Sequence, residues 1–435
     1  MQSEQLLDEI VEQAYREFKD VVDQVSQGGL ERLATLEADV LKGLLHFGSA
    51  IISKILQAKT EDEAESCACL HCLGPTQSLA RRNRGARSLT GAIRYERRVF
   101  RCPACHCLIS PMDRALGLAK GESLTAHAKQ EVARLSGRMD FEAVVQTLRD
   151  LTGLELTDGG ARRVAQTIGK RVADARESVS SGGPLPAVKD APDVLVLEAD
   201  GVHGRFDESD PWHEVMVGVV GSCVVDEGEA RVVRREVVTI PRNRPVFWKC
   251  FEDAAIRNGL FASKRVLFIA DAGGGNFDAV TRFAPHAIQI LNFYHAAQHL
   301  KTALDLIDEG KSDKRFEGQR RCLLAHDGVR HVISNLERLA GRASAALAPD
   351  KRKKLATEIE YFRKNRQRMR YAYFRKQGWP IGSGAVEGAC KSVFQERFKQ
   401  SGMAWTTQGM RAIAALRDAD QSNSWTHVVS PRLAA

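Results

Sequence analysis

Two segments in which an apolar run leads into an aspartate decide the fold class: VLVLEADG at residues 194–201 and VLFIADAGGG at residues 266–275. Runs of aliphatic and β-branched residues of this length are typical of buried strands. The surrounding region holds five such runs and two segments with helical spacing. The strands are predicted at 194–199, 215–220, 232–240, 266–270 and 287–291, and the helices at 247–260 and 277–283. Three strands followed by helix, strand, helix and strand predict a mixed α/β sheet.

Two of these strands are expected to end in a carboxylate beside glycine. Asp200 precedes a glycine, and Asp271 precedes AGGG at 272–275. Such folds place active sites at the carboxyl ends of strands, and glycine lets a ligand approach the backbone. A third acid, Glu387, lies in GSGAVE (382–387), which opens a predicted helix. Three carboxylates from separate segments can hold two Mg²⁺ ions for phosphoryl transfer. The alternative to a metal site is that both aspartates are ordinary turn residues and that Glu387 only interacts favourably with the positive end of a helix dipole.

Six of the ten cysteines fall in CACLHC (67–72) and CPACHC (102–107). The pairs Cys69/Cys72 and Cys102/Cys105 each place two thiolates on one turn, and together they supply a tetrahedral Zn²⁺ shell. The residues between them alternate like a hairpin, which predicts a zinc ribbon. Spare ligands lie nearby at Cys67, His71, His106 and Cys107. The alternative is a redox-active or merely buried group of thiols.

The formal charge of +8 is divided unevenly along the 435 residues. Residues 1–66 carry fourteen acidic and six basic side chains, so the remainder carries +16. So basic a body favours a polyanionic partner, although net charge alone does not separate nucleic acid from solubility. A hydrophobic content of 43% with 27% charge excludes a largely disordered chain. No apolar run approaches the ~20 residues of a membrane span, and the polar N-terminus is not a secretory signal.

Helical spacing dominates the rest of the chain. Residues 1–59 predict two acidic amphipathic helices divided at Gly28-Gly29, packed either on a partner or on their own chain. Residues 124–177 predict a helix, a Thr152-Gly153 break and a second helix capped by Thr157 or Asp158. This is the outline of a helix-turn-helix, although any helical hairpin looks similar. Residues 180–186 (SSGGPLP) are a linker, and residues 295–377 are expected to be helical.

Basic side chains gather in four of these segments and are candidate contacts to DNA phosphates. They are Arg81, Arg82, Arg84, Arg97 and Arg98 in the ribbon; Arg162 and Arg163 in the second helix of the pair; Arg363, Lys364, Arg366, Arg368 and Arg370 within 351–376; and Lys391, Arg397 and Lys399 after Glu387. The third segment also holds aromatic side chains that can stack on unpaired bases, at Tyr361, Phe362, Tyr371, Tyr373 and Phe374. The alternative is a solvated basic face with the aromatics turned to the core.

Several of these segments, in this order, resemble bacterial insertion-sequence DDE transposases of the ISKra type, relatives of the Mutator-like and ISL-type groups. The resemblance spans about residues 67–410 and includes the two aspartates and the CxxC ribbon. Its motifs are SPMD (110–113), FYHAAQHL (293–300), GSGAVE (382–387) and RFKQSGMAW (397–405). It implies an RNase H-like catalytic core, which the predicted strand order fits, with a helical insertion before the final glutamate.

The resemblance also implies roles for individual residues. Asp200, Asp271 and Glu387 would bind Mg²⁺ or Mn²⁺, and His295 would help to organise the catalytic site. Where the family has Asp three residues before the first histidine of its motif, this sequence has Asn292. Asparagine forms hydrogen bonds but does not neutralise a cation, so a copy whose chemistry has decayed is an alternative.

We therefore expect a multidomain α/β DNA transposase that binds element ends and target DNA, uses Mg²⁺ and Zn²⁺, and acts as a homo-oligomer. It would hydrolyse a phosphodiester and join the freed 3′-hydroxyl to target DNA, in the bacterial cytoplasm at the nucleoid. The rivals are a decayed DNA-binding copy and a nuclease without strand joining. The expected parts are an acidic arm (1–66), a zinc ribbon (67–115), a helical DNA-binding region (116–179), the first part of the core (187–294), a helical insertion (295–380) and a C-terminal core helix with tail (381–435).

Overall fold

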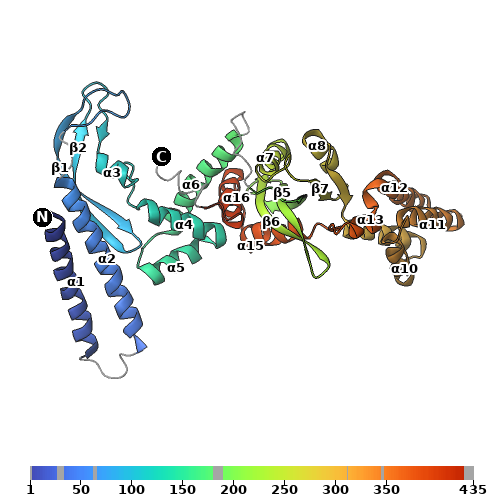
Figure 1. Ribbon diagram of the computed structural model, residues 1–435, viewed down its shortest axis with the longest axis horizontal. Helices are drawn as coiled ribbons and strands as arrows, with labels where there is room; N and C mark the ends of the chain where they lie inside the picture. Colours follow the sequence, from blue (N-terminus) through green and yellow to red (C-terminus); the bar gives the residue numbers. More distant parts are fainter. Residues whose placement is uncertain are drawn as a thin grey trace. The chain divides into compact units, whose positions relative to one another are not determined.

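The computed structural model describes residues 2–26, 34–61, 66–179, 190–310, 312–343 and 347–425. The chain divides into two compact units, Met1–Arg171 with Trp425–Ala435, and Val172–Ser424 (Figure 1). The expected linker at 180–186 and the glycine break at 28–29 lie outside the described residues. Within the described part, no helix is both long and apolar enough to cross a membrane.

The first unit begins with two long helices, α1 (Gln2–Ser26) and α2 (Leu36–Glu61), which lie side by side (Figure 1). Lys54 forms an ion pair with Glu9 at 2.8 Å, and the rings of Phe18 and Phe47 meet at 5.9 Å. The chain's own α2 therefore covers one face of α1, one of the two arrangements that the sequence left open.

The predicted hairpin is an antiparallel ribbon, β1 (Gln77–Ser88), β2 (Gly91–Arg101) and β3 (Leu108–Ile109). Leu56 of α2 packs against Ile93 and Tyr95 on the ribbon's inner face. The strands form because alternate residues of β2 are buried, which is the period of a sheet with one covered face.

Four helices follow the ribbon: α3 (Pro111–Ala115), α4 (Ala126–Arg138), α5 (Phe141–Thr152) and α6 (Asp158–Val179). Gly153 ends α5 at the predicted break, and it adopts the left-handed conformation with φ 67°. Thr157 caps α6, because its Oγ1 accepts a hydrogen bond from Gly160 N at 3.1 Å. Val132, Val144 and Leu148 lie in the core that α4, α5 and the start of α6 share.

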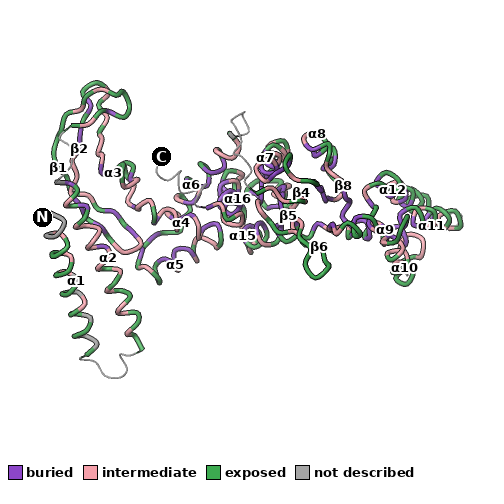
Figure 2. Tube along the Cα trace, in the orientation of Figure 1, coloured by how far each residue is buried: buried purple, intermediate pink, exposed green. Residues whose placement is uncertain are grey.

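The second unit is built on a five-stranded mixed sheet, which confirms the predicted class. Its strands are β4 (Val194–Arg205), β5 (Trp212–Asp226), β6 (Glu229–Pro241), β7 (Arg265–Ala270) and β8 (Ile288–Leu291). The spatial order is β6-β5-β4-β7-β8; β6, β5 and β4 are antiparallel, whereas β4, β7 and β8 are parallel. Buried residues concentrate in this sheet and its covering helices (Figure 2).

Helix α7 (Arg244–Arg257) packs on the antiparallel half of the sheet, and α8 (Asn276–Phe283) links β7 to β8. Phe247 and Phe251 of α7 stack at 5.4 Å over Gly218, where a Cβ atom would lie only 2.6 Å from the Phe251 ring. Helix α16 (Thr407–Gln421) is tied to β6 by Asp418, which accepts hydrogen bonds from the backbone and hydroxyl of Thr239, each at 2.7 Å.

The described part of the segment from 293 to 376 is mostly helical, as predicted for 295–377. It consists of α9 (Phe293–Ile307), α10 (Asp313–Leu323), α11 (Gly328–Ala343), α12 (Pro349–Asn365), the 3-10 turn η2 (Arg366–Met369) and α13 (Tyr371–Lys376). Its core is continuous with that of the sheet through Leu300, Leu336 and Phe362. The chain then forms α14 (Gly384–Ala389), the π-helical turn η3 (Cys390–Gln395) and α15 (Glu396–Phe398).

Candidate functional site

Asp200 lies on β4 just beyond the point where the pairing with its parallel neighbour β7 ends. The last paired residues of β4 and β7 are Glu198 and Ile269, whereas β4 continues beside β5 and Asp200 pairs with Val217. The expectation that Asp200 ends its strand is wrong, because the longer antiparallel partner carries β4 on to Arg205. Extending the parallel register by two residues brings Asp200 level with Asp271.

Asp271 begins the turn after β7. Asn276 Nδ2 donates a hydrogen bond to Asp271 Oδ1 at 3.0 Å, and His295 Nδ1 lies 3.8 Å from Asp271 Oδ2. Gly274 has φ 61°, and a Cβ atom there would collide with the guanidinium of Arg244, which donates to the Gly274 carbonyl. At Gly274, therefore, the expected free space is filled by Arg244, and the glycine serves the turn that presents Asp271.

Glu387 lies in the first turn of α14 and is held by two neutral side chains. Ser383 Oγ donates to Glu387 Oε1 at 3.0 Å, and Asn292 Nδ2 lies 3.3 Å from the same oxygen and 2.6 Å from Ser383 Oγ. Asn292 is 1% exposed, and its Oδ1 accepts a hydrogen bond from Tyr294 N at 3.1 Å, which caps α9. Asn292 thus joins the start of α9 to Glu387 as a hydrogen-bond donor.

The pKa of Asp200 is shifted by the charges of the other two acids. Burial raises the pKa of Asp200, and a hydrogen bond from Gly201 N at 2.7 Å lowers it. The negative charges of Asp271 and Glu387 raise the pKa further, against the opposing effect of His295, and the net shift is upward. Like charges at one place disfavour ionisation, and a bound cation reverses that effect.

A fourth carboxylate, Glu198, lies fully buried two residues before Asp200 on β4. Its Oε2 accepts a hydrogen bond from Val386 N at 2.7 Å, which ties β4 to the first turn of α14. Burial raises the pKa of Glu198 to about 8; bonds from Val386 and Ala385 lower it, and the charge of Glu387 raises it. Sequence reasoning missed this residue. Its signal was a lone acid inside an apolar strand, where an unpaired charge is almost never buried.

None of Asp200, Asp271 and Glu387 forms an ion pair with Lys or Arg among the residues that the structure describes. Several other acids of the chain are paired with arginine: Asp113 with Arg84, Glu214 with Arg244, Glu236 with Arg257, and Asp418 with Arg176. The three acids are therefore a local excess of negative charge. Their oxygens do not form a group within 4.8 Å of one another, unlike the thiols of the ribbon.

His295 and His299 lie one turn apart on α9 and have different partners. His299 Nδ1 lies 2.7 Å from Glu358 Oε2, and its ring stacks on Tyr361 with centroids 3.8 Å apart. Burial raises the pKa of Tyr361, and the charges of Asp271 and Glu358 raise it further. His295 therefore contacts the acid cluster, whereas His299 joins α9 to α12.

The second candidate site is the cysteine cluster of the ribbon. Cys69, Cys72, Cys102 and Cys105 bring four Sγ atoms within 4.8 Å of one another. The Sγ atoms of Cys69 and Cys105 are 3.5 Å apart, and those of Cys72 and Cys102 are 3.4 Å apart. Ligands of a tetrahedral zinc with bonds of about 2.3 Å lie about 3.8 Å apart, so the four thiols can hold a metal such as zinc.

Backbone donors favour the thiolates of Cys69 and Cys102. At Cys72 and Cys105, the backbone donors are outweighed by burial and by hydrogen bonds with neighbouring thiols, which raise the pKa of both. The pKa of Cys102 falls to about 6, chiefly because Cys105 N donates to its sulfur, and the pKa of Cys69 is lowered in the same way by Cys72 N. A second group, His71, Cys105 and Cys107, also lies within 4.8 Å and shares Cys105 with the first. Two of the spare ligands predicted from the sequence are therefore adjacent to the four thiols.

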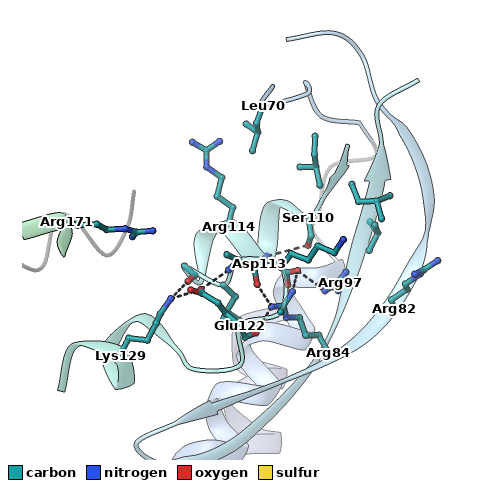
Figure 3. Close-up of a pocket in the computed structure, with 18 residues that line it drawn as sticks. Leu70, Arg82, Arg84, Arg97, Ser110, Asp113, Arg114, Glu122, Lys129 and Arg171 are labelled. Atoms are coloured by element: carbon teal, nitrogen blue, oxygen red, sulfur yellow. Dashed lines mark hydrogen bonds and ion pairs between the residues drawn. The ribbon is translucent and has the colours of Figure 1, made fainter. Parts of the chain in front are cut away.

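Two arginines expected to contact DNA instead form a network around Asp113. Arg84 Nη1 lies 2.5 Å and Arg97 Nε 3.0 Å from Asp113 Oδ2, and Tyr95 donates a hydrogen bond to Oδ1 at 2.9 Å (Figure 3). Arg84 Nη2 also donates to the carbonyls of Ala119 and Glu122. Asp113 is 8% exposed, so this network, hereafter the Asp113 network, fastens the ribbon to the segment that follows it.

The other predicted basic contacts divide by exposure. Most are exposed: Arg81, Arg82, Arg162, Arg163, Arg363, Lys364, Arg366, Arg370, Lys391 and Lys399; Arg98 is half-buried. Arg368 lies over the Phe277 ring at 4.1 Å and donates to Gln289. Arg397 is 0% exposed and lies over the Trp405 ring at 4.9 Å, so it does not offer the solvent-facing charge that we expected.

The aromatic residues of the basic stretch mostly serve the core. Phe362, Tyr371 and Phe374 are at most 2% exposed, so they do not present rings for stacking on bases. Tyr361 stacks on His299, while Tyr373 is 41% exposed beneath the guanidinium of Arg370. The alternative that placed these aromatics in the core therefore holds for three of the five.

The chain is thus a multidomain α/β protein with a mixed sheet and a cysteine cluster that can hold a metal such as zinc. No protein-family model matches its sequence. It is similar to a "UPF0236 protein in vanSb 3'region" of Streptococcus gallolyticus, with 23% identity over 325 residues. The similarity covers 72% of this chain and 67% of that protein.

Proposed function

We propose that this chain is a DDE-type DNA transposase whose catalytic core is RNase H-like. The sheet supports this proposal: three antiparallel strands are followed by two parallel strands in the order β6-β5-β4-β7-β8. The motifs that resemble ISKra-type transposases support it independently, because they contain Asp200, Asp271 and Glu387.

One observation carries the proposal: Asp271 in the turn after β7 and Glu387 on α14 both raise the pKa of Asp200 on β4, and none of the three has an arginine or lysine partner among the described residues. Their donor set is made of oxygen atoms, which suits a hard cation such as Mg²⁺. Two ions about 4 Å apart are bridged by ligands on both sides, so the oxygens need not all lie within one ion's shell.

The chain's residues would divide the work as follows. Asp200, Asp271 and Glu387 would hold Mg²⁺, with Asn292 and Ser383 fixing the position of Glu387. His295 would orient Asp271. When bound, the metal pair would supply the activation of water or a 3′-hydroxyl and the stabilisation of the leaving oxygen. The exposed arginines and lysines would bind the DNA backbone.

The test is cleavage of labelled DNA carrying the ends of the element, in Mg²⁺, by wild type, Glu387→Gln and Glu317→Gln. Glu317 is an exposed acid on α10, so its variant removes the same charge away from the site. We expect Glu387→Gln to lower cleavage at least ~100-fold, because even groups that only support a metal ligand are worth 10–100-fold. Equal cleavage by Glu387→Gln and wild type, with circular dichroism unchanged, would reject the assignment.

A decayed copy that only binds DNA is the second candidate, because Asn292 stands where the family has aspartate. Its buried amide donates to Glu387, a role that aspartate does not fill. Binding of element ends without Mg²⁺-dependent cutting would favour this candidate. Cutting without joined target product would instead favour a nuclease.

A further inference from the structure

A basic pocket lies within the first unit, between the ribbon and the segment 110–122 (Figure 3). Its volume is about 550 Å³, and seven cationic side chains and two carboxylates line it. A pocket of this size holds a small ligand or one unit of a polymer. The surplus of positive charge favours an anion.

Several of these cations already form ion pairs or hydrogen bonds within the chain. Arg84 and Arg97 belong to the Asp113 network, and Lys129 Nζ donates to Glu122 Oε2 at 2.8 Å and to the Gly117 carbonyl at 2.7 Å. These bonds hold Gly117 and Glu122 of the pocket lining in place.

Arg114 and Lys120 differ from these residues, because both are exposed and form no ion pair among the described residues. Arg114 rises from α3 away from the Asp113 network, and Arg171 reaches toward the same opening from α6 (Figure 3). The pKa of Glu122 is lowered overall. Burial raises it, but hydrogen bonds from Lys129 and Ala119 and the charge of Arg171 lower it. The pocket is therefore built before any ligand binds, with cations held at its rim.

Part of the pocket lining is apolar. Leu70 is 55% exposed and Leu108 is 58% exposed, and both line the pocket beside the cations. Large apolar side chains left in water next to unpaired charge indicate a surface that a ligand covers. The matching ligand has an anionic group and an apolar face, as phosphate and deoxyribose do in the backbone of DNA.

We propose that this pocket binds the sugar-phosphate backbone of DNA, with Arg114 and Lys120 on a phosphate and Leu70 and Leu108 against the sugar. The choice of DNA rests on the proposed function. The pocket itself lies outside the acid cluster and needs no Mg²⁺ for binding.

The test measures binding of a fluorescent DNA duplex by anisotropy at several salt concentrations, without Mg²⁺. The full-length variant Arg114→Ala/Lys120→Ala is compared with Arg149→Ala/Lys42→Ala, which removes two exposed cations outside the pocket. We expect the pocket variant to bind about tenfold more weakly at 0.1 M salt and to lose about 1–2 from the slope of log affinity against log salt. The control should keep the wild-type slope.

A second variant, Leu108→Ala, tests the apolar part of the lining without changing charge and should weaken binding at every salt concentration while the slope stays constant. Equal losses in the pocket and control variants would overturn the proposal, as would a wild type that does not bind DNA. If pyrophosphate binding is lost in the pocket variant but DNA binding is kept, the pocket takes a small anion and the proposal is wrong. If the pocket variant fails to bind and wild type binds without cutting, the pocket stands while the proposed catalysis falls.

Discussion

Replacing Asp113 by asparagine tests the Asp113 network. The change keeps the shape of the side chain and an oxygen that Tyr95 can donate to, but it removes the charge that compensates Arg84 and Arg97. The three charged side chains are 11%, 13% and 17% exposed, so water screens them weakly. Removing one partner of a buried ion pair typically costs about 3–5 kcal/mol. The partial exposure places our expectation at about 3 kcal/mol of unfolding free energy for the first unit.

Native-state hydrogen exchange measures this effect locally, because Arg84 also bonds the carbonyls of Ala119 and Glu122. A loss of about 3 kcal/mol corresponds to exchange more than about a hundredfold faster in β1, β2 and the segment 117–122. The matched control is Asp226→Asn, which breaks an ion pair with Arg231 whose side chains are 59% and 69% exposed. That pair is worth about 0–1 kcal/mol. The reasoning is refuted if Asp113→Asn accelerates exchange no more than Asp226→Asn does.

Three further predictions concern the metal and acid sites. The purified chain should contain about one zinc ion by mass spectrometry. Cys102→Ser should lose this zinc, and Cys223→Ser should keep it. Loss of zinc in Cys107→Ser would show that the group of His71, Cys105 and Cys107 binds the metal instead. Asn292→Asp should lower thermal stability by about 1–3 kcal/mol without raising DNA cleavage, because it removes the donor to Glu387; faster cleavage would favour the decayed copy. The raised pKa of Glu198 means that its stabilising contribution is present at low pH and is lost as pH rises through about 8. Without metal, the unfolding free energy of wild type should therefore fall relative to Glu198→Gln from pH 5 to 9, and parallel pH profiles would contradict this assignment.

Much of the secondary structure of the second unit could be predicted from the spacing and length of its apolar runs alone. Runs such as VLVLEA and VLFIA are long enough for a buried strand and too short for a helix, so the mixed sheet was predictable. The length of β4 was not, because it depends on β5, a partner that pairs beyond the point where β7 ends. Asp200 therefore lies inside a strand although its sequence reads as a strand end.

Charge was the weaker guide, because a sequence counts charges without showing their partners. Arg84 and Arg97 meet at Asp113 only through the register of β1 and β2 and the fold of α3. Arg397 lies inside a basic stretch yet is buried against Trp405. The acids were predicted as candidates from their glycine neighbours, but the link from Glu198 to α14 depends on a contact 188 residues apart in sequence.

The position of Asp200 inside a continuous ladder gives the acid cluster one rigid wall. Asp200 is fixed on both sides along the chain by its pairing with β5, whereas Asp271 leads into a glycine turn and Glu387 is exposed on a six-residue helix. A ligand that bridges the three meets a fixed Asp200 and constrains chiefly the turn and the short helix. The loss of conformational freedom on binding therefore falls on Asp271 and Glu387. Substitutions that stiffen those two segments in the right place should tighten binding without touching the ligand.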